Sequence, residues 1–227
     1  MRGLFVTGTD TEAGKTIVAA AIVAGLVAAG VRVAAFKPVV TGLDDPPPDP
    51  WPRDHELLAA AAGVAAGDVA PLTLGPAVSP HLAAELAGVA IEPAELAAAA
   101  RRVASGADAL VVEGVGGLLV PLTTGYAVRD FALDLELPLV VAARPGLGTI
   151  NHTLLTLEAA RAAGLTVRAV VITPWPAAPE AIHESNRATI ERLGGVEVAT
   201  LPWLDGPGAL PGAGAELRPL RWIASGP

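Results

Sequence analysis

Residues 7–16 read TGTDTEAGKT and end in a Gly-Lys-Thr sequence that is typical of phosphate-binding loops. The usual loop has four residues between its first glycine and the Gly-Lys-Thr, whereas five separate Gly8 from Gly14 here. In such a loop, backbone N–H groups and the positive end of the following helix bind phosphate oxygens. Lys15 is expected to reach the β- and γ-phosphates of a nucleotide, and the Thr16 hydroxyl to ligate Mg²⁺. The alternative is a Gly-Lys-Thr that merely begins a helix.

Two carboxylates are candidates to complete a magnesium site beside this loop. Mg²⁺ prefers oxygen ligands, and nucleotide sites supply one or two carboxylates to it. Glu113 follows an apolar run and precedes glycines, which predicts a position at the carboxyl end of a buried strand, where parallel sheets bind ligands. Asp54 precedes HELLAAAA, and Asp is also a common helix N-cap. The structural alternatives are a solvated turn residue at Glu113 and a simple helix cap at Asp54.

Lys37 is a third unusual residue, because it ends an apolar strand in the sequence FKPVVTG. An ammonium group buried there without a partner would be costly. One interpretation is a lysine whose aliphatic stem follows the strand while its amine reaches water. Beside a nucleotide site, the same ammonium group could instead stabilise a phosphate during its transfer.

Short aliphatic runs alternate with helical stretches along the chain. Strands are predicted at 3–8, 31–39, 108–114, 137–143, 167–173 and 196–203. Helices are predicted at 17–29, 151–163 and 179–193. Strands that are hydrophobic throughout are typical of a parallel sheet covered on both faces. The pattern predicts an α/β fold of the P-loop NTPase type, with a doubly wound, mostly parallel sheet and helices on both faces, in a single domain over residues 1–227.

The composition narrows the classes of function. Of the 227 residues, 52% are hydrophobic, enough for a sizeable core, and the net charge of −8 makes nucleic acid and anionic membranes unfavourable partners. The absence of cysteine excludes disulfides, thiolate metal sites and cysteine nucleophiles. The sequence has no signal-peptide pattern, and its apolar runs are shorter than the roughly 18 residues of a membrane helix, so a cytoplasmic protein is expected.

A set of motifs occurs in a fixed order over most of the chain. The motifs are VTGTDTEAGKT (6–16), FKPVVTG (36–42), SPH (79–81), VEGVGGLLVPL (112–122), LGTINHTLLTLEA (147–159) and LPWL (201–204). Together they resemble the dethiobiotin synthetase family, and the first and fourth are the most specific. In that family the Thr-Gly-Thr-Asp-Thr run replaces the standard first glycine of the loop, and its extra polar residues let the loop face a second substrate.

The resemblance implies an ATP-dependent cyclo-ligase of biotin biosynthesis that needs Mg²⁺. Its partners are 7,8-diaminopelargonate, CO₂ and ATP, and its product carries the ureido ring of dethiobiotin. One amine takes up CO₂ to give a carbamate, whose oxygen attacks the γ-phosphate. The second amine closes the ring on the resulting carbamic–phosphoric mixed anhydride and expels phosphate. The resemblance also implies a homodimer with the substrate site at its interface.

The resemblance assigns roles residue by residue. The expected catalytic residues are Thr11, Lys15 and Lys37, and the expected ligands of Mg²⁺ are Thr16, Asp54 and Glu113. The expected nucleotide-binding residues are Glu12, Ala13, Gly14, Lys15, Thr16, Ile17, Asp54, Glu113, Gly114, Gly116, Thr173, Pro174, Pro202, Trp203 and Leu204. The expected substrate-binding residues are Thr11, Glu12, Lys37, Thr41, Gly148, Thr149, Ile150 and Asn151. Among these, the backbone amides of 148–150 at a helix start could bind the carboxylate of the substrate.

Two departures from the family pattern concern recognition. Thr41 stands where many relatives have serine, and either hydroxyl can form a hydrogen bond. Thr173, in VVITPWP, stands where many relatives have an asparagine that reads the nucleotide base. A carboxamide offers both a donor and an acceptor to a base edge, whereas a hydroxyl discriminates less. Relaxed base selectivity is therefore expected, with other nucleoside triphosphates competing with ATP.

Two segments rich in glycine or proline have no predicted regular structure. The prolines of 42–54, GLDDPPPDPWPRD, disfavour a helix or a central strand. Because this segment joins Thr41 to Asp54, a mobile flap beside the site is favoured over a plain surface loop. The segment 206–220, GPGALPGAGAELRPL, is expected to be irregular.

Three other functions share parts of this pattern. A switch ATPase of the partition and septum-site type has a second lysine early in its loop, at the position of Asp10 here. An amidotransferase ligase of the cobyrinate-synthesis group normally carries a glutaminase domain with a cysteine nucleophile, and this chain has no cysteine. A regulator that has lost catalysis would not need to keep Lys15, Lys37, Asp54 and Glu113.

Overall fold

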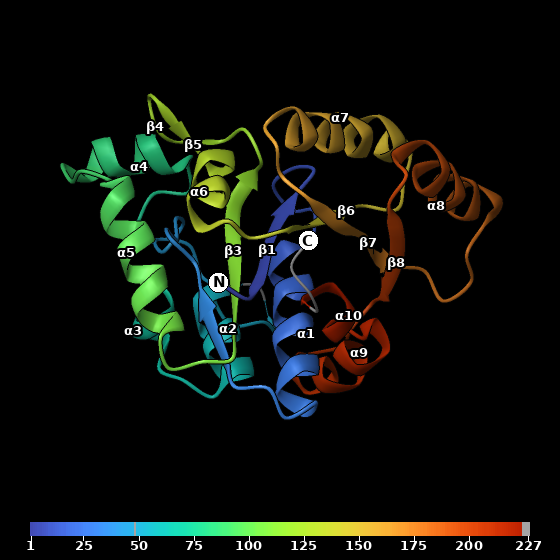
Figure 1. The fold of residues 1–227 in the computed structure, drawn as a ribbon, viewed down its shortest axis with the longest axis horizontal. Coiled ribbons are helices and arrows are strands. Elements are labelled where there is room, and N and C mark those ends of the chain that lie inside the picture. The colour runs from blue at the N-terminus through green and yellow to red at the C-terminus, as the bar shows by residue number, and fades with distance from the viewer. Residues whose placement is uncertain (48, 224–227) are drawn as a thin grey trace.

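The computed structural model describes residues 1–47 and 49–223, and its central feature is a six-stranded parallel sheet (Figure 1). The strand order is β2-β3-β1-β6-β7-β8. These strands are β1 (Gly3–Gly8), β2 (Val33–Phe36), β3 (Ala109–Gly117), β6 (Leu139–Ala143), β7 (Val167–Trp175) and β8 (Glu197–Pro202). A small antiparallel pair lies outside the sheet and consists of β4 (Pro121–Thr123) and β5 (Tyr126–Ala127).

Helices connect the strands and cover the sheet. In chain order they are α1 (Lys15–Ala28), α2 (Asp54–Ala62), α3 (Ala66–Val69), α4 (Pro80–Ala87), α5 (Pro93–Ala104), α6 (Val128–Leu135), α7 (Thr149–Ala162), α8 (Ala181–Gly194), the 3₁₀ turn η1 (Pro207–Ala209), α9 (Leu210–Leu217) and α10 (Leu220–Ile223). Figure 1 shows α9 and α10 beside α1, although these helices come from opposite ends of the chain.

The core lies on both faces of the sheet, because successive strand residues point to opposite sides. Leu4 and Val6 of β1 belong to the cluster that includes α1, α2 and α9. Phe5, between them, belongs to the cluster that includes α5 and α6, where its ring meets Phe131 edge to face at 6.0 Å. A third cluster joins β6, β7 and β8 to α7 and α8.

This two-sided cover explains why the strands are hydrophobic throughout. All residues of β1, β2 and β6 are buried, as expected of parallel strands between two helical layers. The predicted fold class is therefore confirmed. The neighbours of β1 are β3 on one side and β6 on the other, so strands from both halves of the chain meet beside its carboxyl end. Such a switch point in strand order is where open α/β sheets bind ligands.

Two predicted boundaries shift in ways that matter for the site. The second strand, predicted to reach residue 39, ends at Phe36, so Lys37 lies just beyond it and its N–H donates to the Val69 carbonyl at 2.9 Å. The third strand, predicted to end at residue 114, continues to Gly117. Glu113 therefore lies within β3, opposite Val6 of β1, rather than at the strand's tip.

The prediction that 206–220 is irregular is wrong, since the segment contains η1 and α9. Pro207 and Pro211 lie in the first turns of these helices, where a missing N–H removes no helical hydrogen bond. Gly214 lies against α1, and a Cβ atom there would be 2.1 Å from the Ala21 carbonyl oxygen. The glycine thus permits a close helix–helix contact and does not mark a loop.

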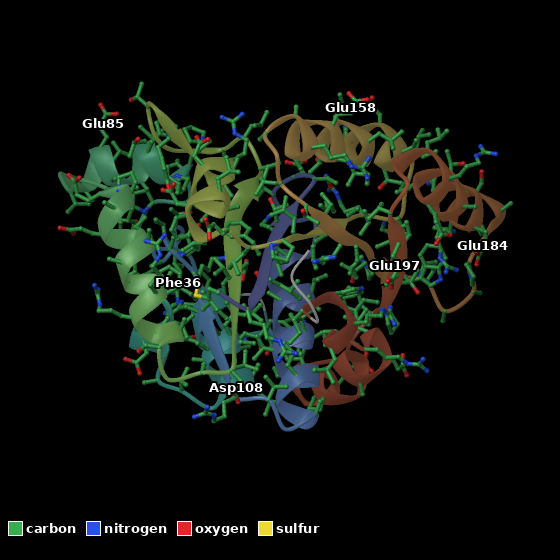
Figure 2. The ribbon with its side chains drawn as sticks, viewed as in Figure 1. Phe36, Glu85, Asp108, Glu158, Glu184 and Glu197 are labelled. Atoms are coloured by element: carbon green, nitrogen blue, oxygen red, sulfur yellow. The ribbon has the colours of Figure 1, made fainter. Side chains whose placement is uncertain are left out.

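Acidic side chains project from the outer helices. Figure 2 shows Glu85 of α4, Glu158 of α7 and Glu184 of α8 pointing away from the body of the protein, and all three are exposed. Within the described ranges, no helix combines the length and the apolar character that crossing a membrane requires.

The contact of α9 with α1 predicts opposite effects for two glycines of the same helix. Gly214→Ala should lower the free energy of unfolding by roughly 1–3 kcal/mol, because its methyl group meets the α1 backbone. At Gly212 a Cβ atom would have no neighbour within 4 Å. Gly212→Ala should therefore raise the free energy of unfolding by roughly 0.5–1 kcal/mol, because alanine favours the helix. Urea denaturation measures both, and equal effects of the two substitutions would contradict the packing.

Candidate functional site

A cleft of about 750 Å³ opens at the carboxyl edge of the sheet, beyond β1, β2 and β3. Its walls are the loop after β1, the start of α1, the segment 42–54 and the end of β3. The residues predicted from the sequence that line it are Thr11, Glu12, Gly14, Lys15, Thr16, Ile17, Lys37, Thr41, Asp54, Glu113 and Gly116. Residues from four separated stretches of sequence thus meet in one cleft.

The loop between β1 and α1 has the backbone shape of an anion-binding turn. Glu12 and Gly14 adopt left-handed conformations, with φ of 60° and 82°, on either side of the buried Ala13. Such alternation turns successive N–H groups toward one concave side. The Thr9 N–H donates to the Ala142 carbonyl of β6 at 3.0 Å, which fixes the first half of the loop to the sheet. The first turn of α1 then adds its unpaired N–H groups.

Lys15 lies in the first turn of α1 and is almost entirely buried. Its ammonium group donates to the Asp10 carbonyl at 2.9 Å, so the side chain folds back over the loop. Burial lowers the pKa of Lys15, and the attraction of Glu113 only partly opposes this effect. The Asp10 side chain accepts a hydrogen bond from the Thr11 N–H at 2.7 Å and pairs with Arg144 at 3.2 Å.

Lys37 is the centre of a charge cluster in which Lys37 and Glu113 are buried and Asp54 is partly exposed. Its Nζ lies 2.6 Å from Asp54 Oδ2 and 2.5 Å from Glu113 Oε1. The Thr16 hydroxyl donates to the same Glu113 oxygen at 2.8 Å. Lys37 is 3% exposed and Glu113 is fully buried, so neither charge is solvated by bulk water. The alternative in which the Lys37 amine reaches the solvent is therefore wrong.

The pKa values of this cluster follow from burial and pairing. Burial alone would lower the pKa of Lys37, but the charges of Glu113 and Asp54 outweigh it and raise the pKa. Burial raises the pKa of Glu113 despite the nearby ammonium group. For Asp54, burial raises the pKa, but the charge and hydrogen bond of Lys37, together with Thr16 and Lys15, outweigh it and lower the pKa. The pair Lys37–Asp54 is therefore held in its charged form.

The residues present fit a magnesium ion. The Thr16 hydroxyl and the carboxylates of Asp54 and Glu113 are hard oxygen donors from three different elements. Glu113 Oε2 is buried and has no hydrogen-bond partner in the described part of the chain, so it retains an unused acceptor. Across residues 1–47 and 49–223, no group of three or more His, Cys, Asp or Glu side chains could hold a metal ion, so any metal here would rely on the hydroxyl or on further ligands.

The proline-rich segment 42–54 forms one wall of the cleft, apart from position 48, which lies outside the described residues. The Arg53 side chain donates to the Leu43 carbonyl at 2.9 Å, so the two ends of the segment are tied together. Asp54 is not a helix cap but the first residue of α2, for which Arg53 is the N-cap. At its middle, Pro50 lies near Gly206, beyond β8.

Thr173 lies against the phosphate loop although it does not line the cleft. It is buried at the end of β7, and a Cβ atom on Gly14 would be 2.4 Å from the Thr173 methyl group. The other predicted nucleotide-binding residues outside the cleft differ in exposure, since Leu204 is buried and Trp203 is 70% exposed. The set outside the cleft also includes Ala13, Gly114, Pro174 and Pro202.

Residues 148–151 begin α7 and do not line the cleft of the same chain. Gly148, with φ of 91°, is the N-cap, and the Thr149 N–H donates to the Gly146 carbonyl in a long bond of 3.3 Å. Asn151 is exposed, and Leu147 just before the helix is 95% exposed. Gly148 and Asn151 at this end of α7 are therefore accessible, whereas Thr149 is buried.

Several cleft residues were not predicted from the sequence as site residues. They are Val40, Gly42, Leu43, Asp45, Pro46, Pro47, Trp51, Pro52, Arg53, Leu57, Ala77, Val78, Ser79, Pro80, Val115 and Val120. Those from the proline segment belong to the stretch that was predicted to lie beside the site, although only Asp54 in it was named as a site residue. For the apolar residues, the sequence does not distinguish a position in a cleft wall from a position in the hydrophobic core.

The contact between Gly14 and Thr173 predicts a rescue. Gly14→Ala should weaken nucleotide binding at least about tenfold, because the new methyl group meets Thr173 and the left-handed backbone suits glycine. Thr173→Ser removes the opposing methyl group, so the double variant should recover part of the loss, while Thr173→Ser alone should bind almost normally. Calorimetric titration with ADP measures all three, and a double variant as weak as Gly14→Ala would contradict the contact.

Comparisons with known proteins agree with this fold and cover most of the chain. A family model described as an AAA domain matches residues 2–208. The cell division ATPase MinD of Pyrococcus furiosus superposes with a TM-score of 0.54 at 17% identity, over 96% of this chain and 89% of that one. The signal recognition particle receptor FtsY of Elizabethkingia anophelis gives 0.51 at 12% identity, over 87% of this chain and 57% of that one. These likenesses support the P-loop NTPase fold alone.

Curated relatives are much more similar in sequence, and each is named ATP-dependent dethiobiotin synthetase. The protein of Anaeromyxobacter dehalogenans strain 2CP-1 is 43% identical, over 89% of this chain and 91% of that one. The protein of Bacillus cereus strain G9842 is 38% identical over 91% and 85%, and that of Bacillus subtilis strain 168 is 35% identical over 87% and 85%. The aligned regions cover most of both sequences, and the fold has its phosphate loop in place. This chain therefore belongs to the ATP-dependent dethiobiotin synthetase family.

Proposed function

We propose that this chain closes the ureido ring of dethiobiotin from 7,8-diaminopelargonate, CO₂ and ATP. The observation that carries the proposal is the ammonium group of Lys37, buried beside the phosphate loop and paired with Asp54 and Glu113. A cleft that gathers a nucleotide loop, two carboxylates and a second lysine suits phosphoryl transfer to an acceptor that is bound next to the nucleotide. The names of the relatives support the same reaction.

The loop residues would bind and orient the triphosphate. Backbone N–H groups around Glu12 and Gly14 would hold phosphate oxygens, and Lys15 would leave the Asp10 carbonyl to contact the β- and γ-phosphates. Thr16, Asp54 and Glu113 would hold Mg²⁺, which would neutralise charge on the phosphates. Phosphoryl transfer gains mainly from such positioning and charge neutralisation, so no covalent enzyme intermediate is required.

Lys37 would act on the group that is transferred. One amine of the substrate takes up CO₂ as a carbamate, whose oxygen attacks the γ-phosphate to give a carbamic–phosphoric mixed anhydride and ADP. The second amine then attacks the carbamic carbon, and phosphate leaves. The Lys37 ammonium would stabilise the carbamate and the negative charge that develops on the γ-phosphoryl oxygens. Its burial in the cleft makes that interaction stronger than it would be in water.

The remaining cleft walls suit a diamine on an aliphatic chain. Thr11, Glu12 and Thr41 offer two hydroxyls and a carboxylate for the amines, and Thr11 lies near Gly116 across the cleft. Apolar surface comes from Val40, Val115 and Val120, and it would contact the methylene chain. A cleft lined by both polar and apolar groups suits the amines and the methylene chain of 7,8-diaminopelargonate.

The carboxylate end of the substrate would be bound by a second copy of the chain. Residues 148–151 do not line the cleft of their own chain, and Gly148 and Asn151 are exposed, as is Leu147 just before the helix, at 95%. A homodimer that brings this helix start to the partner's cleft would let its N–H groups bind a carboxylate. The substrate site would then lie at the dimer interface.

The proposed reaction predicts a product that depends on every component. The purified protein with 7,8-diaminopelargonate, bicarbonate, Mg²⁺ and ATP should form dethiobiotin together with ADP and phosphate. Mass spectrometry of complete mixtures, and of mixtures that lack one component each, measures this. ATP hydrolysis that the diamine does not affect, without dethiobiotin, would contradict the proposal and favour a switch ATPase.

Base recognition would be relaxed in this chain. The Thr173 methyl group packs toward Gly14, and its single hydroxyl is the only polar group that this side chain can offer to a base. Leu204 and Trp203, in the segment after β8, would contact the base through apolar surface, which does not distinguish one base from another. Other nucleoside triphosphates would therefore replace ATP in the reaction.

The proposed base recognition predicts a shallow preference among nucleotides. The values of kcat/KM for GTP, CTP and UTP should lie within about a hundredfold of that for ATP, because one hydroxyl discriminates weakly. Thr173→Asn should increase the preference for ATP, since a carboxamide offers both a donor and an acceptor. A preference for ATP of more than about a hundredfold in the unmodified protein would contradict this prediction.

A further inference from the structure

The ammonium group of Lys37 contacts the same oxygens that a metal ion would need. It lies 2.6 Å from Asp54 Oδ2 and 2.5 Å from Glu113 Oε1, and the latter oxygen also accepts the Thr16 hydroxyl. These are the three side chains to which the proposed function assigns Mg²⁺. One buried cation therefore already offsets part of the negative charge of this oxygen cluster.

We propose that Lys37 excludes the metal ion until a nucleotide arrives, so that the metal and the triphosphate enter the site together. This inference rests on the proposed assignment of Thr16, Asp54 and Glu113 as metal ligands. The triphosphate supplies negative charge close to the Lys37 ammonium and draws it away from the carboxylates. The carboxylates then lose their cation at the moment when a metal ion bound to the phosphates can replace it.

Two features make the ammonium group an effective competitor. Lys37 and Glu113 are buried, so their attraction is little screened by water and salt. Mg²⁺ gives up its hydration water reluctantly, and two carboxylates that already share an ammonium group offer it little charge in return. Displacing Lys37 without providing another anion would leave a buried ammonium group unpaired, which is costly.

Lys15 is a natural control because it is the other buried lysine of the cleft. Its ammonium group donates to the Asp10 carbonyl, not to the carboxylates of the cluster. Removing Lys15 therefore takes the same charge out of the cleft and leaves the contacts among Lys37, Asp54 and Glu113 in place. A specific role of Lys37 can thus be separated from a general effect of positive charge near the site.

The test measures how tightly Mn²⁺ binds to the protein in the absence of nucleotide. The concentration of free Mn²⁺ is monitored by electron paramagnetic resonance. Mn²⁺ accepts the same oxygen ligands as Mg²⁺. The unmodified protein has the Lys37 ammonium group that is proposed to compete with the metal ion, and Lys37→Met lacks it. Lys15→Met is the matched control. Lys37→Met should bind Mn²⁺ at least about tenfold more tightly than the unmodified protein, and Lys15→Met should change the affinity much less. Adding a non-hydrolysable ATP analogue should bring tight Mn²⁺ binding to the unmodified protein.

Two results would overturn the inference. One is tight Mn²⁺ binding by the unmodified protein without nucleotide, which can be measured even if the variants do not fold. The other is an equal gain of affinity in Lys37→Met and Lys15→Met. Lys37→Gln is a second variant, whose amide can still donate to one carboxylate and thus supports folding. None of these measurements uses the diamine or turnover, so failure here is distinct from failure of ring closure.

Discussion

The structure of the site depends on how the charge of Glu113 is compensated inside the sheet. This carboxylate is fully buried on β3. Burying a charge there without a partner would destabilise the fold by roughly several kcal/mol. Lys37, from the segment after β2, and Thr16, from the first turn of α1, both reach it. Asp54, at the start of α2, accepts a hydrogen bond from the same Lys37 ammonium group. Four elements are thus joined at the carboxyl edge of the sheet by one cluster of two carboxylates, an ammonium group and a hydroxyl, and the cleft lies where they converge.

The order of the strands brings these groups together. β3 lies between β1 and β2, so the residues that follow β1 and β2 flank Glu113 from both sides. Parallel strands end at one edge, and that edge collects the phosphate loop, Lys37 and the proline-rich segment in a single cleft. The same architecture occurs in MinD and FtsY at low sequence identity, which means that the fold does not itself define the chemistry. The chemistry of this chain rests on its own side chains in the cleft, the two buried lysines and the two carboxylates.

The sequence was sufficient for the fold class and for much of the cleft, because both depend on local patterns. Fully hydrophobic strands required cover on both faces, and the Gly-Lys-Thr between a strand and a helix marked the phosphate loop. The pairing of Lys37 with Asp54 and Glu113 could not be derived in this way, since it depends on three-dimensional proximity across the sheet. The helix α9 was missed because glycine and proline indicate loops only when no partner is near. Here Gly214 serves a contact with α1 that no local pattern reveals.

That contact packs α9 against the helix that also carries the first residues of the phosphate site. Helix α1 carries Lys15 and Thr16 in its first turn, and Gly25, near its other end, would clash with the Gly214 carbonyl oxygen if it had a Cβ atom, at 2.5 Å. The close approach of Gly25 and Gly214 packs α9 against α1 about 15 Å from the phosphate-binding end of α1, at about 1.5 Å per residue. Helix α9 thus supports, from the end opposite the cleft, the helix whose first turn lines the cleft.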